Sequence, residues 1–162
     1  MKKFLFALLL LSVSIGIQAQ KKMPEVSVKT LDGEEVSSVE FSNDGKPMII
    51  SFWATWCKPC LNELSAFTDE FDDWHEETGV KIIAISIDDT RASARVKSLV
   101  YGKDWPFEVY LDQNQDLKRA LNVVNVPHTF VLNGKGEIVW EHTSYNPGNE
   151  DEVIEQVRQL IK

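Results

Sequence analysis

Residues 52–60, FWATWCKPC, contain both cysteines of this chain, and the interpretation of the whole sequence begins with them. The two thiols are three positions apart, so a bond between them closes a loop of only four residues. By the chain-entropy argument, such a crosslink stabilises a fold by about 2 kcal/mol, less than a bridge across a long loop. A purely structural disulfide is therefore disfavoured as the role of this pair, and metal binding and redox reactivity are the two alternatives.

The position of the pair favours reactivity. Cys57 lies between an apolar run of strand length, MIISFW at residues 48–53, and a helix that begins near Pro59, since proline is favoured in a first helical turn. A thiol at this junction faces the free N–H groups and the positive end of the helix, which lower its pKa, and Lys58 adds a positive charge. Cys60, one turn further, is expected to be more enclosed. One exposed acidic thiol and one sheltered partner suit thiol–disulfide exchange.

The rest of the chain alternates between strand and helix patterns. The predicted strands are residues 26–30, 34–36, 48–53, 80–88, 107–112, 128–133 and 137–142. The predicted helices run from Pro59 to Gly79, over 90–101 with Gly102 as the stop, over 116–121, and from a cap at Asn149 towards the end. This order predicts a three-layer α/β domain with a mixed sheet. Asp32-Gly33 predicts a hairpin in front of it.

Residues 1–19 are predicted to be an export signal, and residues 20–162 a single domain. A short basic start precedes an apolar run of 14 residues, 4–17, and a small residue follows at Ala19. A helix needs ~20 residues to cross a bilayer, so the run favours a cleavable signal, with an uncleaved N-terminal anchor as the alternative. We therefore expect an exported protein that is periplasmic or otherwise extracytoplasmic.

The charge of the chain argues against some partners. The formal net charge is −8, whereas nucleic acids and anionic membrane surfaces attract positively charged proteins. The densest acidic run, TDEFDDWHEE at residues 68–77, has six carboxylates but lacks the spacing of a calcium-binding loop. Phe71 and Trp74 interrupt it as a buried stripe would. The run is therefore interpreted as the solvated face of a helix.

Metal binding and peroxide reduction are weaker alternatives. Structural zinc needs four ligands, and the chain has one CxxC pair with three histidines, none at ligand spacing. Copper(I) fits somewhat better, because two thiolates and His128 would suffice. Peroxide-reducing thiols usually follow a P-x-x-x-T-x-x-C pattern, in which Thr55 would be misplaced and the proline is missing. Redox exchange is the favoured interpretation, and a copper-binding chaperone is kept as the alternative.

The sequence also resembles a known family. The W-C-K-P-C motif after an apolar strand resembles the thioredoxin superfamily, and more closely its TlpA/ResA-like branch of exported thiol–disulfide oxidoreductases. The segments that carry this resemblance are LDGEEV, GKPMIISFWATWCKPCLNEL, IIAISID and VPHTFVLNGKGEIVW. Together they extend over roughly residues 24–162, the whole predicted domain. The resemblance implies a thioredoxin fold, three-layer α/β/α with a central mixed sheet and an added N-terminal β-hairpin.

The resemblance implies roles for particular residues. Cys57 matches the nucleophile and Cys60 the resolving cysteine of the family. Pro127 matches the cis-proline that sits against the active-site disulfide. Val126 matches the residue whose backbone binds a substrate chain as an added strand. Trp56 is expected to cover one side of the disulfide.

Two further positions bear on proton transfer. Ser51 stands six residues before Cys57, where cytosolic thioredoxins bury an aspartate, and Glu63 matches a glutamate typical of the TlpA/ResA-like branch. We expect Glu63 to be partly buried, with a raised pKa, and to move protons for the cysteine pair. A solvent-facing helix position is the alternative for Glu63. His128 is expected to point away from the sulfurs, and we leave it out of the catalytic set.

The implied activity is the reduction of disulfides in partner proteins, such as apocytochrome c or misoxidised exported proteins. No metal or organic cofactor is implied, and a membrane thiol-reducing electron donor is expected to recharge the pair. Pro59 resembles the reducing type of active-site loop, whereas Lys58 would push the redox potential upward. A disulfide-forming oxidant of the same fold is therefore kept as an alternative.

Overall fold

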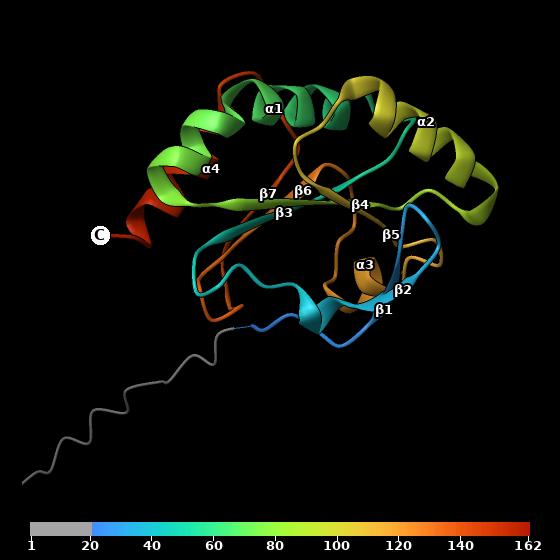
Figure 1. Cartoon of the computed structure of the whole chain (residues 1–162), viewed down its shortest axis with the longest axis horizontal. Helices are drawn as coiled ribbons and strands as arrows, with labels where there is room; N and C mark the ends of the chain where they lie inside the picture. The colour runs from blue at the N-terminus through green and yellow to red at the C-terminus, as the bar shows by residue number, and fades with distance from the viewer. Residues whose placement is uncertain (1–20) are drawn as a thin grey trace, which may run out of the picture.

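The computed structural model describes residues 21–162, so the predicted signal at residues 1–19 lies outside the described residues. A seven-stranded sheet forms the centre of the molecule, with strand order β2-β1-β5-β4-β3-β6-β7. The strands are β1 (Ser27–Thr30), β2 (Glu35–Ser37), β3 (Met48–Trp53), β4 (Lys81–Ser86), β5 (Glu108–Leu111), β6 (His128–Leu132) and β7 (Ile138–Thr143). Figure 1 shows the sheet nearly edge-on, with helices above and below it.

The helices form the two outer layers. They are α1 (Lys58–Thr78), α2 (Ser93–Lys103), α3 (Asp116–Ala120) and α4 (Asn149–Gln159), with short 3-10 turns at Ser38–Glu40 and Thr90–Ala92. In Figure 1, α1 and α2 cover one face of the sheet and α3 lies on the other. Helix α4 packs against α1 and β6. The predicted three-layer α/β/α architecture is confirmed. Within residues 21–162, the structure contains no helix with the length and apolar character to span a membrane.

The sheet is mixed, as predicted, and its pairing places the site. Strand β3 pairs in parallel with β4 and antiparallel with β6. All six residues of β3 are buried, as expected for a central strand covered on both faces. In the β3–β6 register, Phe52 is opposite His128. The segment before His128 therefore lies beside the end of β3, where the chain turns towards Cys57. The predicted N-terminal hairpin, β1–β2, extends the sheet through antiparallel pairing of β1 with β5.

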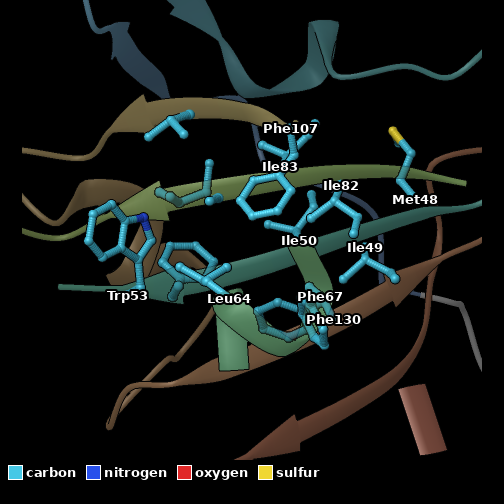
Figure 2. Close-up of a cluster of buried hydrophobic side chains, with 14 of the residues drawn as sticks. Met48, Ile49, Ile50, Trp53, Leu64, Phe67, Ile82, Ile83, Phe107 and Phe130 are labelled. Atoms are coloured by element: carbon cyan, nitrogen blue, oxygen red, sulfur yellow. The ribbon is translucent and has the colours of Figure 1, made fainter. Parts of the chain in front are cut away.

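Helix α1 follows its predicted pattern. Leu64, Phe67 and Trp74 are buried at spacings of three and seven residues, which place them on one side of the helix, and they pack on the sheet. Figure 2 shows Leu64 and Phe67 in one buried cluster with side chains of β3 and β4. The carboxylates of the acidic run are all exposed, so the interpretation as a solvated face is confirmed. Gly79 ends the helix at φ 67°, a conformation that glycine adopts without strain.

Two helix ends differ from the sequence-based prediction. Helix α2 continues through Gly102 and ends at Lys103, because Asp104 adopts the left-handed conformation that stops it, at φ 51°. Asn149 is not the cap of α4 but its first helical residue, after Gly148 at φ 98°. The Asn149 side chain instead accepts a hydrogen bond from the backbone N–H of Asn146, at 2.7 Å. In both places a neighbouring residue with positive φ sets the helix end.

Candidate active site

Cys57 caps the N-terminus of α1. The turn before it is closed by a hydrogen bond from the Cys57 N–H to the carbonyl of Ala54, at 3.0 Å. Cys57 then adopts an extended conformation, and its Sγ accepts the N–H of Cys60 at 3.3 Å. Pro59 lies in the first turn, where its missing N–H costs nothing. This is the strand–helix junction predicted from the sequence, and a thiolate at this position would face the positive end of α1.

Cys57 and Cys60 form a disulfide, with their Cα atoms 5.3 Å apart. Cys60 is fully buried, while Cys57 retains 5% exposure. The predicted order of accessibility is therefore correct, but Cys57 is far less exposed than expected. The chain segment that contains Val126 contributes to this burial, since the Val126 carbonyl oxygen lies 3.7 Å from the Cys57 sulfur. A partner disulfide can therefore reach the pair only where the Cys57 side chain remains exposed to solvent.

Glu63 is buried on the same side of α1 as Cys60, one turn further along the helix. It is 2% exposed, so the alternative of a solvent-facing position is wrong. The Ser51 hydroxyl donates to its Oε2 at 2.7 Å, and the Thr129 hydroxyl donates to its Oε1 at 3.0 Å. Burial raises the pKa of Glu63 to about 7, although these two hydrogen bonds oppose the rise. Near neutral pH, this carboxyl group can therefore both take up and release a proton.

The hydrogen-bond partners of Glu63 include one residue that the sequence analysis missed. Ser51 departs from the cytosolic pattern, whereas Thr129 is not among the predicted site residues. The two are directly opposite each other in the β3–β6 register and are both fully buried. The available signal was a polar residue inside an apolar strand, in MIISFW and again in HTFVL. In this chain the buried carboxylate belongs to Glu63 on α1, and the small Ser51 side chain on β3 leaves space for it.

The predicted substrate-binding residues gather beside the disulfide. The Val126–Pro127 peptide bond is cis, as the resemblance implies, and Pro127 is buried. Trp56 is 66% exposed and lines a hollow of about 250 Å³ together with Ile87 and Val126. Trp53, by contrast, is fully buried and packs edge-on against Trp105, with ring centroids 4.9 Å apart. The hollow beside Trp56 thus has a mixed apolar and polar lining, which also includes Gln115 and Lys118, that a partner chain can contact.

The predicted tuning residues, Lys58 and Pro59, are both exposed at the start of α1. His128 points away from the sulfurs, as predicted. Its neighbour Thr129 faces Glu63 and successive strand residues face opposite sides, so the His128 ring lies on the far face of the sheet. There it contacts the Phe130 ring, with centroids 4.5 Å apart.

The copper-binding alternative requires His128 to join the two sulfurs. The His128 ring instead lies 2.9 Å from the Thr143 hydroxyl on the far face of the sheet. Across residues 21–162, no group of three or more His, Cys, Asp or Glu side chains is arranged to hold a metal ion. The three-ligand copper site is therefore not assembled in this part of the chain.

Comparison with known proteins agrees with this geometry. The model of the AhpC/TSA family matches residues 19–141. The chain is 31% identical over 143 residues to sporulation thiol-disulfide oxidoreductase A of Bacillus subtilis (strain 168), an alignment that covers 85% of this chain and 83% of that protein. It is 31% identical over 121 residues to thiol-disulfide oxidoreductase ResA of Bacillus thuringiensis subsp. konkukian (strain 97-27), which covers 75% of this chain and 67% of that protein.

A solved structure supports the same assignment. An uncharacterised thioredoxin-like protein from Porphyromonas gingivalis matches with a TM-score of 0.78 and 49% identity, covering 86% of this chain and 91% of that one. The predicted thioredoxin fold and the resemblance to ResA-like proteins are thus confirmed. The chain therefore belongs to the AhpC/TSA family of thioredoxin-like proteins, and within it the chain is a ResA-type thiol–disulfide oxidoreductase.

Proposed function

We propose that the protein is an exported reductant of disulfides in partner proteins. The Cys57 thiolate attacks a partner disulfide, whose S–S bond breaks, and one partner sulfur leaves as a thiolate while the other joins Cys57. Cys60 then passes its proton to Glu63, and its sulfur attacks Cys57. The mixed disulfide breaks, the second partner sulfur leaves as a thiolate, and the Cys57–Cys60 disulfide forms. The partner gains two electrons and the cysteine pair loses them.

The observation that carries this proposal is the buried carboxyl group of Glu63. Cys60 is fully buried, and burial in apolar surroundings disfavours its thiolate. The second step therefore needs a base near Cys60. Glu63 follows Cys60 at i,i+3 on α1, a spacing that brings side chains together, and its pKa of about 7 suits it to accept this proton. The protonated group can return this proton when the pair reacts in the opposite direction, so Glu63 supports the exchange mechanism, while the redox potential of the pair sets its direction.

The partner chain is proposed to bind along Val126. No backbone hydrogen bond of the described residues uses the Val126 N–H or carbonyl group, so both can pair with an added strand. Cis-Pro127 would hold this edge against the disulfide, while Trp56 would cover the partner chain from the other side. The exposed charge of Lys58 would stabilise the Cys57 thiolate, and Pro59 would favour the reducing direction.

Export and recharging are also parts of the proposal. The basic start and the apolar run at residues 4–17 support export, with cleavage after Ala19. In an oxidising compartment the reduced pair must be regenerated, so a membrane thiol-reducing donor is the second partner. Apocytochrome c and misoxidised exported proteins are the proposed substrates. The mass of the protein recovered outside the cytoplasm tests cleavage, because an uncleaved anchor leaves the full-length mass.

The midpoint potential of the Cys57–Cys60 pair tests the direction. Equilibration with a thiol buffer, followed by tryptophan fluorescence, reports the pair because Trp56 is adjacent to Cys57. A value near or below about −250 mV agrees with a reductant. A value near about −120 mV would make the protein a disulfide-forming oxidant.

Trapping of the intermediate tests the order of attack. Cys60→Ser should accumulate a mixed disulfide between Cys57 and a partner, because the resolving thiol is gone. Cys57→Ser should form none and should lose disulfide-reducing activity. Retained activity in Cys57→Ser would contradict the mechanism. Stoichiometric copper(I) binding that protects both thiols, without a reversible two-electron redox pair, would favour the copper-binding alternative instead.

A further inference from the structure

Asp88 is a buried carboxylate to which the proposed reaction gives no part. It is 4% exposed and follows the end of β4 by two residues. Trp53 is opposite Ser86 in the parallel β3–β4 pair, and the Ile87 N–H donates to the Trp53 carbonyl at 2.9 Å. The chain that leaves β4 therefore runs beside the chain that leads from β3 to Cys57.

The Asp88 carboxylate accepts hydrogen bonds from three parts of the fold. Thr55 donates twice, with its N–H to Oδ2 at 2.8 Å and its hydroxyl to Oδ1 at 2.7 Å. The Ser86 hydroxyl donates to Oδ2 at 2.9 Å, and the Arg95 guanidinium of α2 lies 3.5 Å from Oδ1. These partners are donors, which suits a carboxylate anion, and hydrogen bonds to an ionised group are stronger than neutral ones. Asp88 thus ties the active-site loop to β4 and α2.

Thr55 occupies the turn that presents Cys57. This turn runs from Ala54 to Cys57 and is closed by the hydrogen bond between them, so Thr55 is its second residue. The orientation of this turn decides whether Cys57 Sγ can accept a hydrogen bond from the Cys60 N–H. In the structure this hydrogen bond is 3.3 Å long. A group that fixes Thr55 therefore fixes the cap geometry of the sulfur.

We propose that Asp88 is a positioning residue for the attacking thiol, and that it acts through Thr55 on the turn that holds Cys57 at the first amides of α1. The inference rests on the proposed role of Cys57 as the attacking thiol. Two effects of the Thr55 contacts act in the same direction. A fixed turn keeps the Cys60 N–H on the sulfur, which favours the thiolate. The Thr55 hydroxyl also offsets part of the Asp88 charge, which would otherwise oppose a nearby thiolate.

Thr55→Val tests this inference, because valine keeps the shape of threonine and removes only the hydroxyl donor. The reduced full chain is alkylated with iodoacetamide over a range of pH, and the modified cysteine is identified by mass spectrometry. We expect the apparent pKa of Cys57 to rise by about half a unit, so that alkylation below this pKa slows about threefold. Equilibrium with glutathione should shift about threefold towards the disulfide, since the reduced form loses a stabilising contact.

Two control variants separate positioning from general stability. Thr55→Ser keeps the hydroxyl and should behave as the wild type. Thr78→Val loses a buried hydroxyl at the other end of α1, where Oγ1 donates to the Trp74 carbonyl at 2.7 Å. It should lower the thermal unfolding temperature and leave the Cys57 titration unchanged.

The outcomes distinguish this inference from the proposed function. A Thr55→Val titration and glutathione equilibrium equal to those of the wild type would show that the hydroxyl contact between Thr55 and Asp88 does not act on Cys57, and would overturn the inference alone. A failure of Thr55→Ser to restore wild-type behaviour would also overturn it. Alkylation of Cys60 before Cys57 in the wild type would overturn the proposed order of attack, and the inference with it.

Discussion

Glu63→Gln separates the charge of Glu63 from its shape, because glutamine fills the same volume without ionising. In the oxidised protein, burial raises the pKa of Glu63 from its ordinary value of 4.5 to about 7. At about 1.4 kcal/mol per pH unit, this difference corresponds to about 3 kcal/mol, as an order of magnitude. The Ser51 and Thr129 hydroxyls can rotate to serve glutamine as donor and acceptor, so the fold should tolerate the substitution.

The sign of the effect follows from the direction of the pKa change. Between pH 4.5 and 7 the folded protein keeps the Glu63 proton that the unfolded chain has released. Stability therefore falls as pH rises through this interval, and above about pH 7 the loss from this group is complete. The wild type should lose about 3 kcal/mol of unfolding free energy through Glu63 over this range, and Glu63→Gln should not.

Urea unfolding of the oxidised proteins at pH 5 and pH 8 measures this difference. Because part of the loss has already occurred at pH 5, the unfolding free energy of Glu63→Gln relative to wild type should increase by about 2.5 kcal/mol between the two pH values. Glu70→Gln, which removes an exposed carboxylate from the same helix, should show no comparable change. If the difference in unfolding free energy between the wild type and Glu63→Gln is the same at both pH values, the argument that burial raises the pKa of Glu63 is refuted.

The same variant tests the proton transfer. If Glu63 accepts the Cys60 proton, Glu63→Gln should slow the resolution of the mixed disulfide on the order of 100-fold. The first attack by Cys57 should change much less, because it does not use this proton. Rapid mixing with a partner disulfide, quenched by acid, resolves the two steps. Equal slowing of both steps would contradict the assignment.

Three further substitutions test the surroundings of the site. Trp56→Ala should leave thermal stability nearly unchanged, because Trp56 is 66% exposed, and should lower the rate of protein-disulfide reduction by about tenfold. Lys58→Glu should lower the midpoint potential by about 10–20 mV in a thiol redox titration, because it disfavours the Cys57 thiolate, and 1 M salt should reduce this effect. Phe67→Ala should cost about 3–5 kcal/mol in urea unfolding while the reduction rate of the folded fraction is preserved, since Phe67 is fully buried in the core.

Local patterns were sufficient for most of the fold. The helix that carries Cys60 could be predicted because Leu64, Phe67 and Trp74 repeat at helical spacing, and this repeat depends only on residues of the helix itself. The end of α2 could not be predicted in this way. Gly102 has no conformational need to stop a helix, and the left-handed conformation of Asp104 gives no reliable signal in sequence.

The burial of Glu63 shows the limit for the candidate site. Helical spacing alone allowed a solvent-facing position, and only the resemblance favoured burial. Its burial depends on Ser51 and Thr129, which belong to two strands and lie 12 and 66 residues away in sequence. Its pKa depends on desolvation by all the chain segments that surround it, so no single neighbour in sequence encodes the value.

The sequence by itself determined that two thiols lie at a strand–helix junction, with one of them at the helix N-terminus. The strand, the proline in the first turn and the three-residue spacing are neighbours in the chain, and local geometry relates them directly. Tertiary structure alone decided that Val126 covers Cys57 from 69 residues away and that Asp88 holds Thr55 from 33 residues away. These contacts depend on how β3, β4 and β6 are ordered in the sheet, and that order is set by the packing of the whole core.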